Sequence, residues 1–148
     1  MKALQYRWIS IALGSWLMLL LLTGCAAEAE LAPGPDALDA GHPALPAIVS
    51  VDTVAELVAA EADVVVIDVR EDWEFAQGRI PGARWLPMAQ IPGRLDDIPR
   101  DVPVILACRS DNRSGQVYQF LRQQGFENVH NMRGGMVHWV ASGHDIER

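Results

Sequence analysis

Two short, uninterrupted apolar runs, at residues 64–67 and 104–107, set the strongest limit on how this chain can fold. A strand with one face in water alternates apolar and polar residues, whereas a strand covered on both faces is apolar throughout. Parallel strands are joined by crossover helices, which cover the two faces of the sheet. The predicted fold class is therefore α/β, with a small parallel β-sheet flanked by helices on both faces.

The remaining elements follow from β-branched runs and helical periodicity. Further strands are expected at residues 48–51, 83–86 and 129–131, and helices at residues 53–60, 72–77, 91–96, 114–124 and 136–142. Thr53 followed by Glu56 matches a capping box, and Gly125 stands where a helix C-terminus favours glycine. One domain over residues 48–148 is predicted.

The first 24 residues resemble the signal peptide of a bacterial lipoprotein. Lys2 and Arg7 precede a mainly apolar stretch, residues 9–22, which is shorter than the ~20 apolar residues of a spanning helix. This stretch ends in the sequence Leu-Thr-Gly-Cys, which is similar to a lipobox. The resemblance implies that residues 1–24 are removed and that Cys25 becomes the lipidated first residue. An ordinary secretory signal, with Cys25 incidental, is the alternative.

Residues 25–47 are expected to form a flexible tether. They contain Pro33, Pro35, Pro43 and Pro46 and few large apolar side chains. The predicted protein is exported and anchored by lipid to the cell envelope, facing the periplasm. Ala26, rather than Asp, after the lipidated cysteine favours the outer membrane in a host with two membranes.

Charge and composition exclude two classes of function. The formal net charge is −7, and removal of residues 1–24 leaves 10 basic against 19 acidic residues, a charge of −9. Nucleic-acid binding needs a basic face, so a nucleic-acid partner is not expected. The four histidines, at positions 42, 130, 138 and 144, show no metal-ligand spacing with one another or with Cys108, so no metal is predicted.

The segment after residues 104–107 carries the predicted chemistry. Cys108 follows the strand directly, and only six residues, 108–113, separate that strand from a helix. In such a loop the backbone N–H groups and the helix dipole attract anions, and the same field favours a cysteine thiolate. Arg109 and Arg113 add two positive charges against one negative charge from Asp111. The pattern predicts an anion-binding loop with Cys108 as the nucleophile.

Residues 108–114 resemble the active-site loop of the rhodanese family of sulfurtransferases, commonly C-R-S-G-N-R-S. Three further segments resemble family motifs in the same order. Residues 68–74 are similar to D-V-R-x-x-x-E, residues 78–83 to G-H-I-P-G-A, and residues 125–139 to G-F-x-x-V followed by G-G-x-x-x-W. The resemblance spans residues 48–148 and implies transfer of sulfane sulfur through a persulfide on Cys108.

The resemblance also implies roles for the other loop residues. Cys108 attacks the outer sulfur of a donor such as thiosulfate, sulfite leaves, and a nucleophilic acceptor then removes the sulfur. A partner protein is an alternative acceptor. No cofactor is needed for this transfer. Arg113 closes the loop, while Arg109 is freer to meet the anion. Asp68 and Arg70 anchor loops near the site, through an ion pair with Glu74 or a backbone contact. The predicted substrate-binding residues are Arg109, Ser110, Asp111, Asn112 and Arg113.

Two departures from the family pattern limit what can be carried over. Arg79 stands where the family usually has histidine, which we expect to change surface polarity more than chemistry. Asp111 replaces a common glycine and brings a negative charge to an anion site. The identity of the sulfur donor is therefore left open.

Two alternative functions compete with sulfur transfer. Phosphatases and arsenate reductases of the same fold use a cysteine loop with five residues between Cys and Arg, whereas four separate Cys108 from Arg113. A non-catalytic rhodanese-like docking module is the other alternative. Retention of Cys108 and both arginines argues against it.

Overall fold

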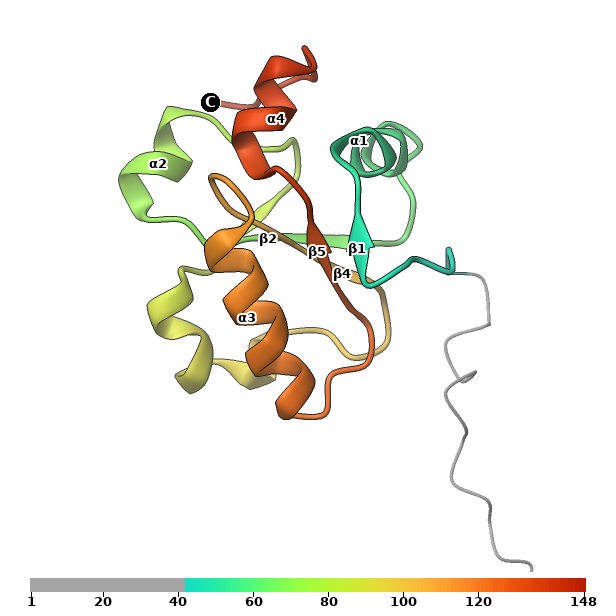
Figure 1. Cartoon of the computed structure of the whole chain (residues 1–148), viewed down its shortest axis with the longest axis vertical. Helices are drawn as coiled ribbons and strands as arrows, with labels where there is room; N and C mark the ends of the chain where they lie inside the picture. Colours follow the sequence, from blue (N-terminus) through green and yellow to red (C-terminus); the bar gives the residue numbers. More distant parts are fainter. Residues whose placement is uncertain (1–41) are drawn as a thin grey trace, which may run out of the picture. The chain divides into compact units, whose positions relative to one another are not determined.

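The computed structural model of the chain describes residues 42–148 (Figure 1). The predicted signal peptide, the predicted lipidation site Cys25 and most of the predicted tether lie outside the described residues. Within the described part, no helix combines the length and apolar character needed to cross a bilayer.

Five parallel strands form one sheet in the order β1-β5-β4-β2-β3. The two apolar runs of the sequence are the neighbouring strands β4 and β2, which pair from Val65 opposite Val104 to Asp68 opposite Ala107. This arrangement confirms the predicted parallel α/β fold. The strands are β1 (Ile48–Val49), β2 (Val65–Asp68), β3 (Arg84–Trp85), β4 (Val104–Ala107) and β5 (Val129–Met132).

Helices cover both faces of the sheet (Figure 1). On one face α1 (Val51–Ala59) and α4 (Gly135–Ala141) pack against alternate strand residues such as Ile105. On the other face α3 (Asn112–Gln123) and the 3₁₀ helices η1 (Met88–Gly93) and η2 (Leu95–Asp97) cover residues such as Leu106. The short helix α2 (Asp72–Gln77) follows β2 at the carboxyl edge of the sheet.

Several element boundaries differ from those predicted, for local reasons. α1 begins at Val51 because Ser50 caps it, its Oγ accepting a hydrogen bond from the N–H of Thr53. The predicted capping box on Thr53 is therefore wrong. The helix expected at 91–96 is replaced by two 3₁₀ helices, the first of which contains Pro92, a residue that cannot donate a helical hydrogen bond. Gly125 follows the end of α3 with φ +78°, as predicted for that glycine.

A buried ion pair fixes the carboxyl end of β2. The Asp68 side chain is about 1% exposed, and its carboxylate accepts hydrogen bonds from the Arg70 guanidinium at 2.6–2.9 Å. Arg70 also donates to the carbonyl of Gly78 at 2.8 Å. Of the two contacts considered from the sequence, the backbone contact of Arg70 is present, and the carboxylate that pairs with Arg70 is Asp68 rather than Glu74.

We expect Asp68→Asn to lower the free energy of unfolding by about 3 kcal/mol, because a buried guanidinium loses its counter-charge. Urea unfolding of the purified protein measures this. Arg94→Gln is the matched control, because Arg94 and Asp97 form an exposed pair, about half accessible on each side, that contributes below about 1 kcal/mol. Equal losses in the two variants would contradict the structural role of the buried pair.

Candidate active site

The thiol of Cys108 lies at the floor of the loop between β4 and α3. Cys108 is 1% exposed, and its Sγ accepts a hydrogen bond from the Ser114 hydroxyl at 3.3 Å. Ser114 belongs to the first turn of α3 and is itself fully buried. The structure therefore places the predicted nucleophile beside the N-terminus of a 12-residue helix, where the field of the helix favours negative charge.

Asp111 shapes the loop through its backbone and its side chain. It adopts a left-handed conformation, φ +72°, and its carbonyl accepts a helical hydrogen bond from the N–H of Gly115 at 2.9 Å. Its carboxylate accepts a hydrogen bond from the N–H of Gly134 at 3.2 Å. The Asp111 side chain is thus held against the segment that leads into α4, which the sequence did not indicate.

The start of α4 packs directly on the Cys108 loop. The N–H of Met136 donates to the carbonyl of Cys108 at 2.8 Å. Gly135 has φ +57°, and a Cβ there would overlap the carbonyl of Cys108 and the backbone of Arg109. Glycine is needed at this position for both reasons.

Arg113 is held by an acidic residue from another element. Its guanidinium donates to both carboxylate oxygens of Glu74 on α2, at 2.7 and 2.8 Å. Hydrogen bonding from Arg113 holds the pKa of Glu74 below its ordinary value, and the same bonds raise the pKa of Arg113. The N–H of Glu71 also donates to Glu74, at 3.2 Å, so the capping box of α2 orients the acid that holds Arg113.

The other predicted binding residues stand around the loop. Arg109, Ser110 and Asn112 are exposed, and Asn112 accepts a hydrogen bond from the Gln116 side chain at 2.7 Å. Sequence reasoning gave no role to Ser114, although its place in the loop motif was a signal for it. The sequence suggested an ion pair of Glu74 with Arg70, whereas the structure pairs Glu74 with Arg113, 39 positions further along the chain.

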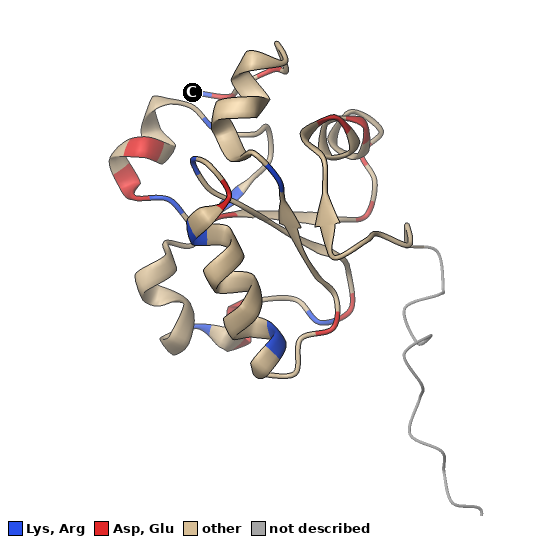
Figure 2. Ribbon diagram, in the orientation of Figure 1, with Lys and Arg blue, Asp and Glu red and all other residues tan. Residues whose placement is uncertain are grey.

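The sequence predicted an excess of positive side-chain charge at the loop, and the structure brings acidic residues of another element beside it. Figure 2 shows acidic residues on α2, next to the β4–α3 loop, which carries both basic and acidic residues. Glu74 pairs with Arg113, and the loop itself carries one acidic residue, Asp111, whose carboxylate is bonded to the N–H of Gly134. Arg79 lies over the ring of Phe75 and pairs with Glu147, outside the Cys108 loop.

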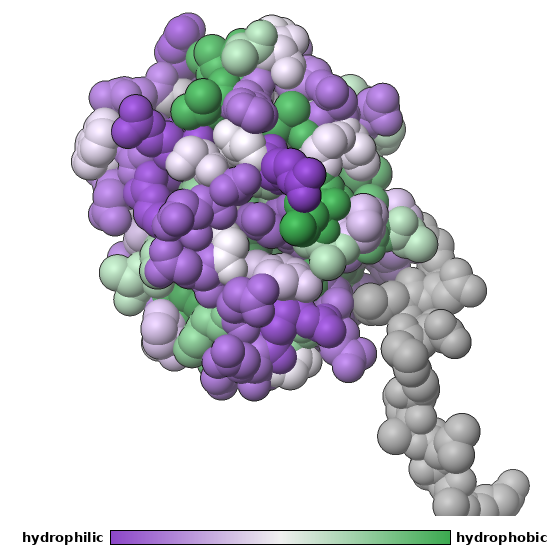
Figure 3. Space-filling model, in the orientation of Figure 1, coloured by the Kyte–Doolittle hydropathy of each residue, from purple (hydrophilic) through white to green (hydrophobic). Residues whose placement is uncertain are grey.

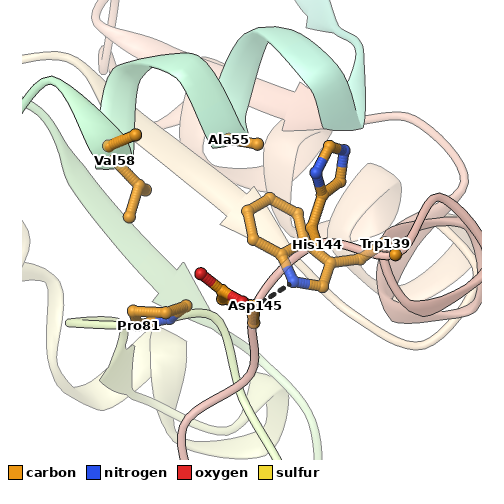
Figure 4. A pocket seen from close by; sticks show the side chains of 8 residues that line it. Ala55, Val58, Pro81, Trp139, His144 and Asp145 are labelled. Atoms are coloured by element: carbon orange, nitrogen blue, oxygen red, sulfur yellow. Dashed lines mark hydrogen bonds between the residues drawn. The ribbon is translucent and has the colours of Figure 1, made fainter.

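A cavity of about 410 Å³ elsewhere in the molecule contains none of the loop residues. It lies between α1 and the C-terminal segment, beside Trp139, whose indole N–H donates to the carbonyl of Asp145 at 2.8 Å (Figure 4). Cavity size therefore does not indicate where the candidate active site lies. The buried thiol of Cys108 is the feature that marks it. Among residues 42–148, no three His, Cys, Asp or Glu side chains gather as a metal site.

Comparisons with known proteins agree with this geometry. Residues 50–142 match the Rhodanese-like domain family. The chain is 42% identical over 92 residues to a protein of Allochromatium vinosum named sulfurtransferase, covering 62% of this chain and 86% of the relative. It is 34% identical over 94 residues to the thiosulfate sulfurtransferase GlpE of Pseudoalteromonas translucida, covering 64% and 89%. The solved structure of SSP1007 from Staphylococcus saprophyticus matches with a TM-score of 0.63 and 34% identity, covering 70% and 100%.

Replacing Glu74 with Gln removes the charge that holds Arg113. Because the folded state lowers the pKa of Glu74, the pair stabilises the fold fully above pH 4.5, and this contribution is lost as the pH falls through the lowered pKa. At neutral pH we expect the wild type to exceed Glu74→Gln in unfolding free energy by about 1.5–3 kcal/mol. Urea titrations at neutral and acidic pH measure the difference.

The same titrations on Glu127→Gln provide the control, since Glu127 is exposed. That substitution should change the unfolding free energy little at either pH. A wild-type advantage over Glu74→Gln that persists undiminished in acid would show that the Glu74 charge does not carry it.

Proposed function

Because the chain belongs to the rhodanese-like family, which includes the sulfurtransferases related to it, we propose that it transfers sulfane sulfur through a persulfide on Cys108. The observation that supports this most directly is the burial of one thiol, hydrogen-bonded by Ser114, beside the first turn of α3. A thiolate there has a preorganised polar surrounding, and the persulfide that replaces it occupies the same loop.

The proposed cycle has two balanced steps. The Cys108 thiolate attacks the outer sulfur of a donor such as thiosulfate; a new S–S bond forms at Cys108, the donor's S–S bond breaks, and sulfite leaves with its electron pair. An acceptor nucleophile, cyanide in an assay, then attacks the outer sulfur and releases the thiolate. No metal or organic cofactor takes part in either step.

The position of Arg113 weighs against phosphatase chemistry. Both of its terminal nitrogens are occupied by Glu74, and four residues separate it from Cys108. A guanidinium held in this way supports the loop, and two of its five N–H donors are already used by Glu74. A docking role without catalysis would not require the buried thiol and its Ser114 hydrogen bond.

We expect Cys108→Ser to reduce thiocyanate formation from thiosulfate and cyanide to the rate without enzyme, because a hydroxyl cannot carry the sulfur. Circular dichroism checks that the fold is retained. Cys25→Ser is the matched control and should keep the activity. Turnover that survives in Cys108→Ser would overturn the mechanism.

The protein's location is a separate proposal, supported only by the sequence of residues 1–25. We propose that residues 1–24 direct export and that Cys25 carries the lipid that anchors the domain to the cell envelope, facing the periplasm.

The same two cysteine variants also test the lipid anchor. Here Cys25→Ser is the test and Cys108→Ser is the control. Cys25→Ser should move the protein out of the membrane fraction of cells, whereas Cys108→Ser should stay in it, because only the first variant loses the acylated thiol. Fractionation followed by immunoblotting measures this. Wild-type protein found wholly in the soluble fraction would contradict lipid anchoring.

A further inference from the structure

A second cavity, of about 180 Å³, adjoins the Cys108 loop between α2 and α4. Two of its lining residues contact the loop: Glu74 through the ion pair with Arg113, and Met136 through the hydrogen bond to the carbonyl of Cys108. The cavity thus lies next to the elements that hold the predicted nucleophile, and its volume is that of a small organic group.

The walls of this cavity suit an uncharged group. Val140, Ile146 and Met136 line it together with two further uncharged residues, Gln77 and Gly78. Arg70, the arginine in its wall, is already held by Asp68. Val140 is 57% exposed, and Figure 3 shows hydrophobic surface over α4. An organic group there would gain apolar contact without displacing an ion pair.

The side-chain charges around the loop cancel. Arg113 pairs with Glu74 and Arg70 with Asp68, whereas the Asp111 carboxylate accepts a hydrogen bond from the N–H of Gly134. The four arginines at this edge of the sheet face four acidic residues: Arg70, Arg109, Arg113 and Arg133 against Asp68, Glu71, Glu74 and Asp111. Asp72 on α2 adds one further negative charge. A dianion such as thiosulfate therefore finds no net positive charge on the side chains of this edge to attract it.

We propose that the preferred sulfur donor is the persulfide of a small organic thiol with an uncharged organic group, and that this group lies in the cavity between α2 and α4. The inference rests on the proposed sulfur transfer through Cys108. The Cys108 thiolate attacks the terminal sulfur of R–S–SH, the S–S bond of the donor breaks, and R–S⁻ leaves. The product is Cys108–S–SH, so one S–S bond replaces another and no oxidant is needed.

The first experiment compares two donors on the purified full-length protein. Sulfur uptake by Cys108 is followed by intact mass, with thiosulfate or with the persulfide of N-acetylcysteine methyl ester. We expect kcat/KM for the organic persulfide to exceed that for thiosulfate about tenfold, as a well-placed apolar contact allows. We also expect kcat/KM for thiosulfate not to fall steeply with salt, because the side chains of this edge carry no net positive charge to screen. A preference for thiosulfate, or a steep fall with salt, would overturn the proposal.

The second experiment fills the cavity. Val140→Phe places a larger side chain in it and should lower the ratio of the two kcat/KM values, persulfide over thiosulfate, about five-fold. Val137→Phe is the matched control: Val137 lies on the same helix, is 51% exposed and does not line the cavity, so the ratio should stay constant. A ratio unchanged in Val140→Phe, or changed equally in both variants, would overturn the proposed place of the organic group.

The outcomes separate this inference from the proposed function. Uptake from thiosulfate that exceeds uptake from the organic persulfide, and that is absent in Cys108→Ser, would leave sulfur transfer in place and remove the inference about the donor. Sulfur uptake from neither donor would contradict both the proposed sulfur transfer and the inference about the donor.

Discussion

Parallel pairing of β2 with β4 is the constraint on which the rest of the site depends. The pairing sets Asp68 opposite Ala107, so the segments that carry Arg70 and Cys108 leave the sheet side by side. β5 lies on the other side of β4 and delivers Gly134 and Gly135 to the same edge. Residues far apart in the sequence thereby surround one thiol without any long loop to position them.

The carboxylates that hold the loop in place also neutralise the positive charge of the arginines that they bind. Glu74 orients Arg113, and Asp68 orients Arg70, each through more than one hydrogen bond. Such pairs fix geometry well, but a paired arginine attracts an approaching anion less than a free one does. The backbone N–H groups of the loop and the start of α3 therefore remain as the main source of positive potential at Cys108.

The sequence predicted the sheet and singled out Cys108 as the proposed nucleophile because both signals are local. Apolar runs identify β2 and β4, and the motif after β4 identifies Cys108. The pairing of Glu74 with Arg113 could not be predicted, since it depends on where α2 lies relative to α3, which periodicity does not report. The hydrogen bond from Gly134 to Asp111 was missed for the same reason. The start of α1 was misplaced because Ser50 and Thr53 are both good caps, and only the backbone angles decide between them.

The contact between Gly135 and the carbonyl of Cys108 has a consequence for local unfolding. This close approach lets the N–H groups of Met136 and Val137 donate to the carbonyls of Cys108 and Arg109, so the Cys108 loop cannot rise without breaking the hydrogen bonds that join it to the first turn of α4. We expect the loop and that turn to form one cooperative opening unit, whose amide protons exchange with solvent at similar rates although 26 residues separate Cys108 from Gly135.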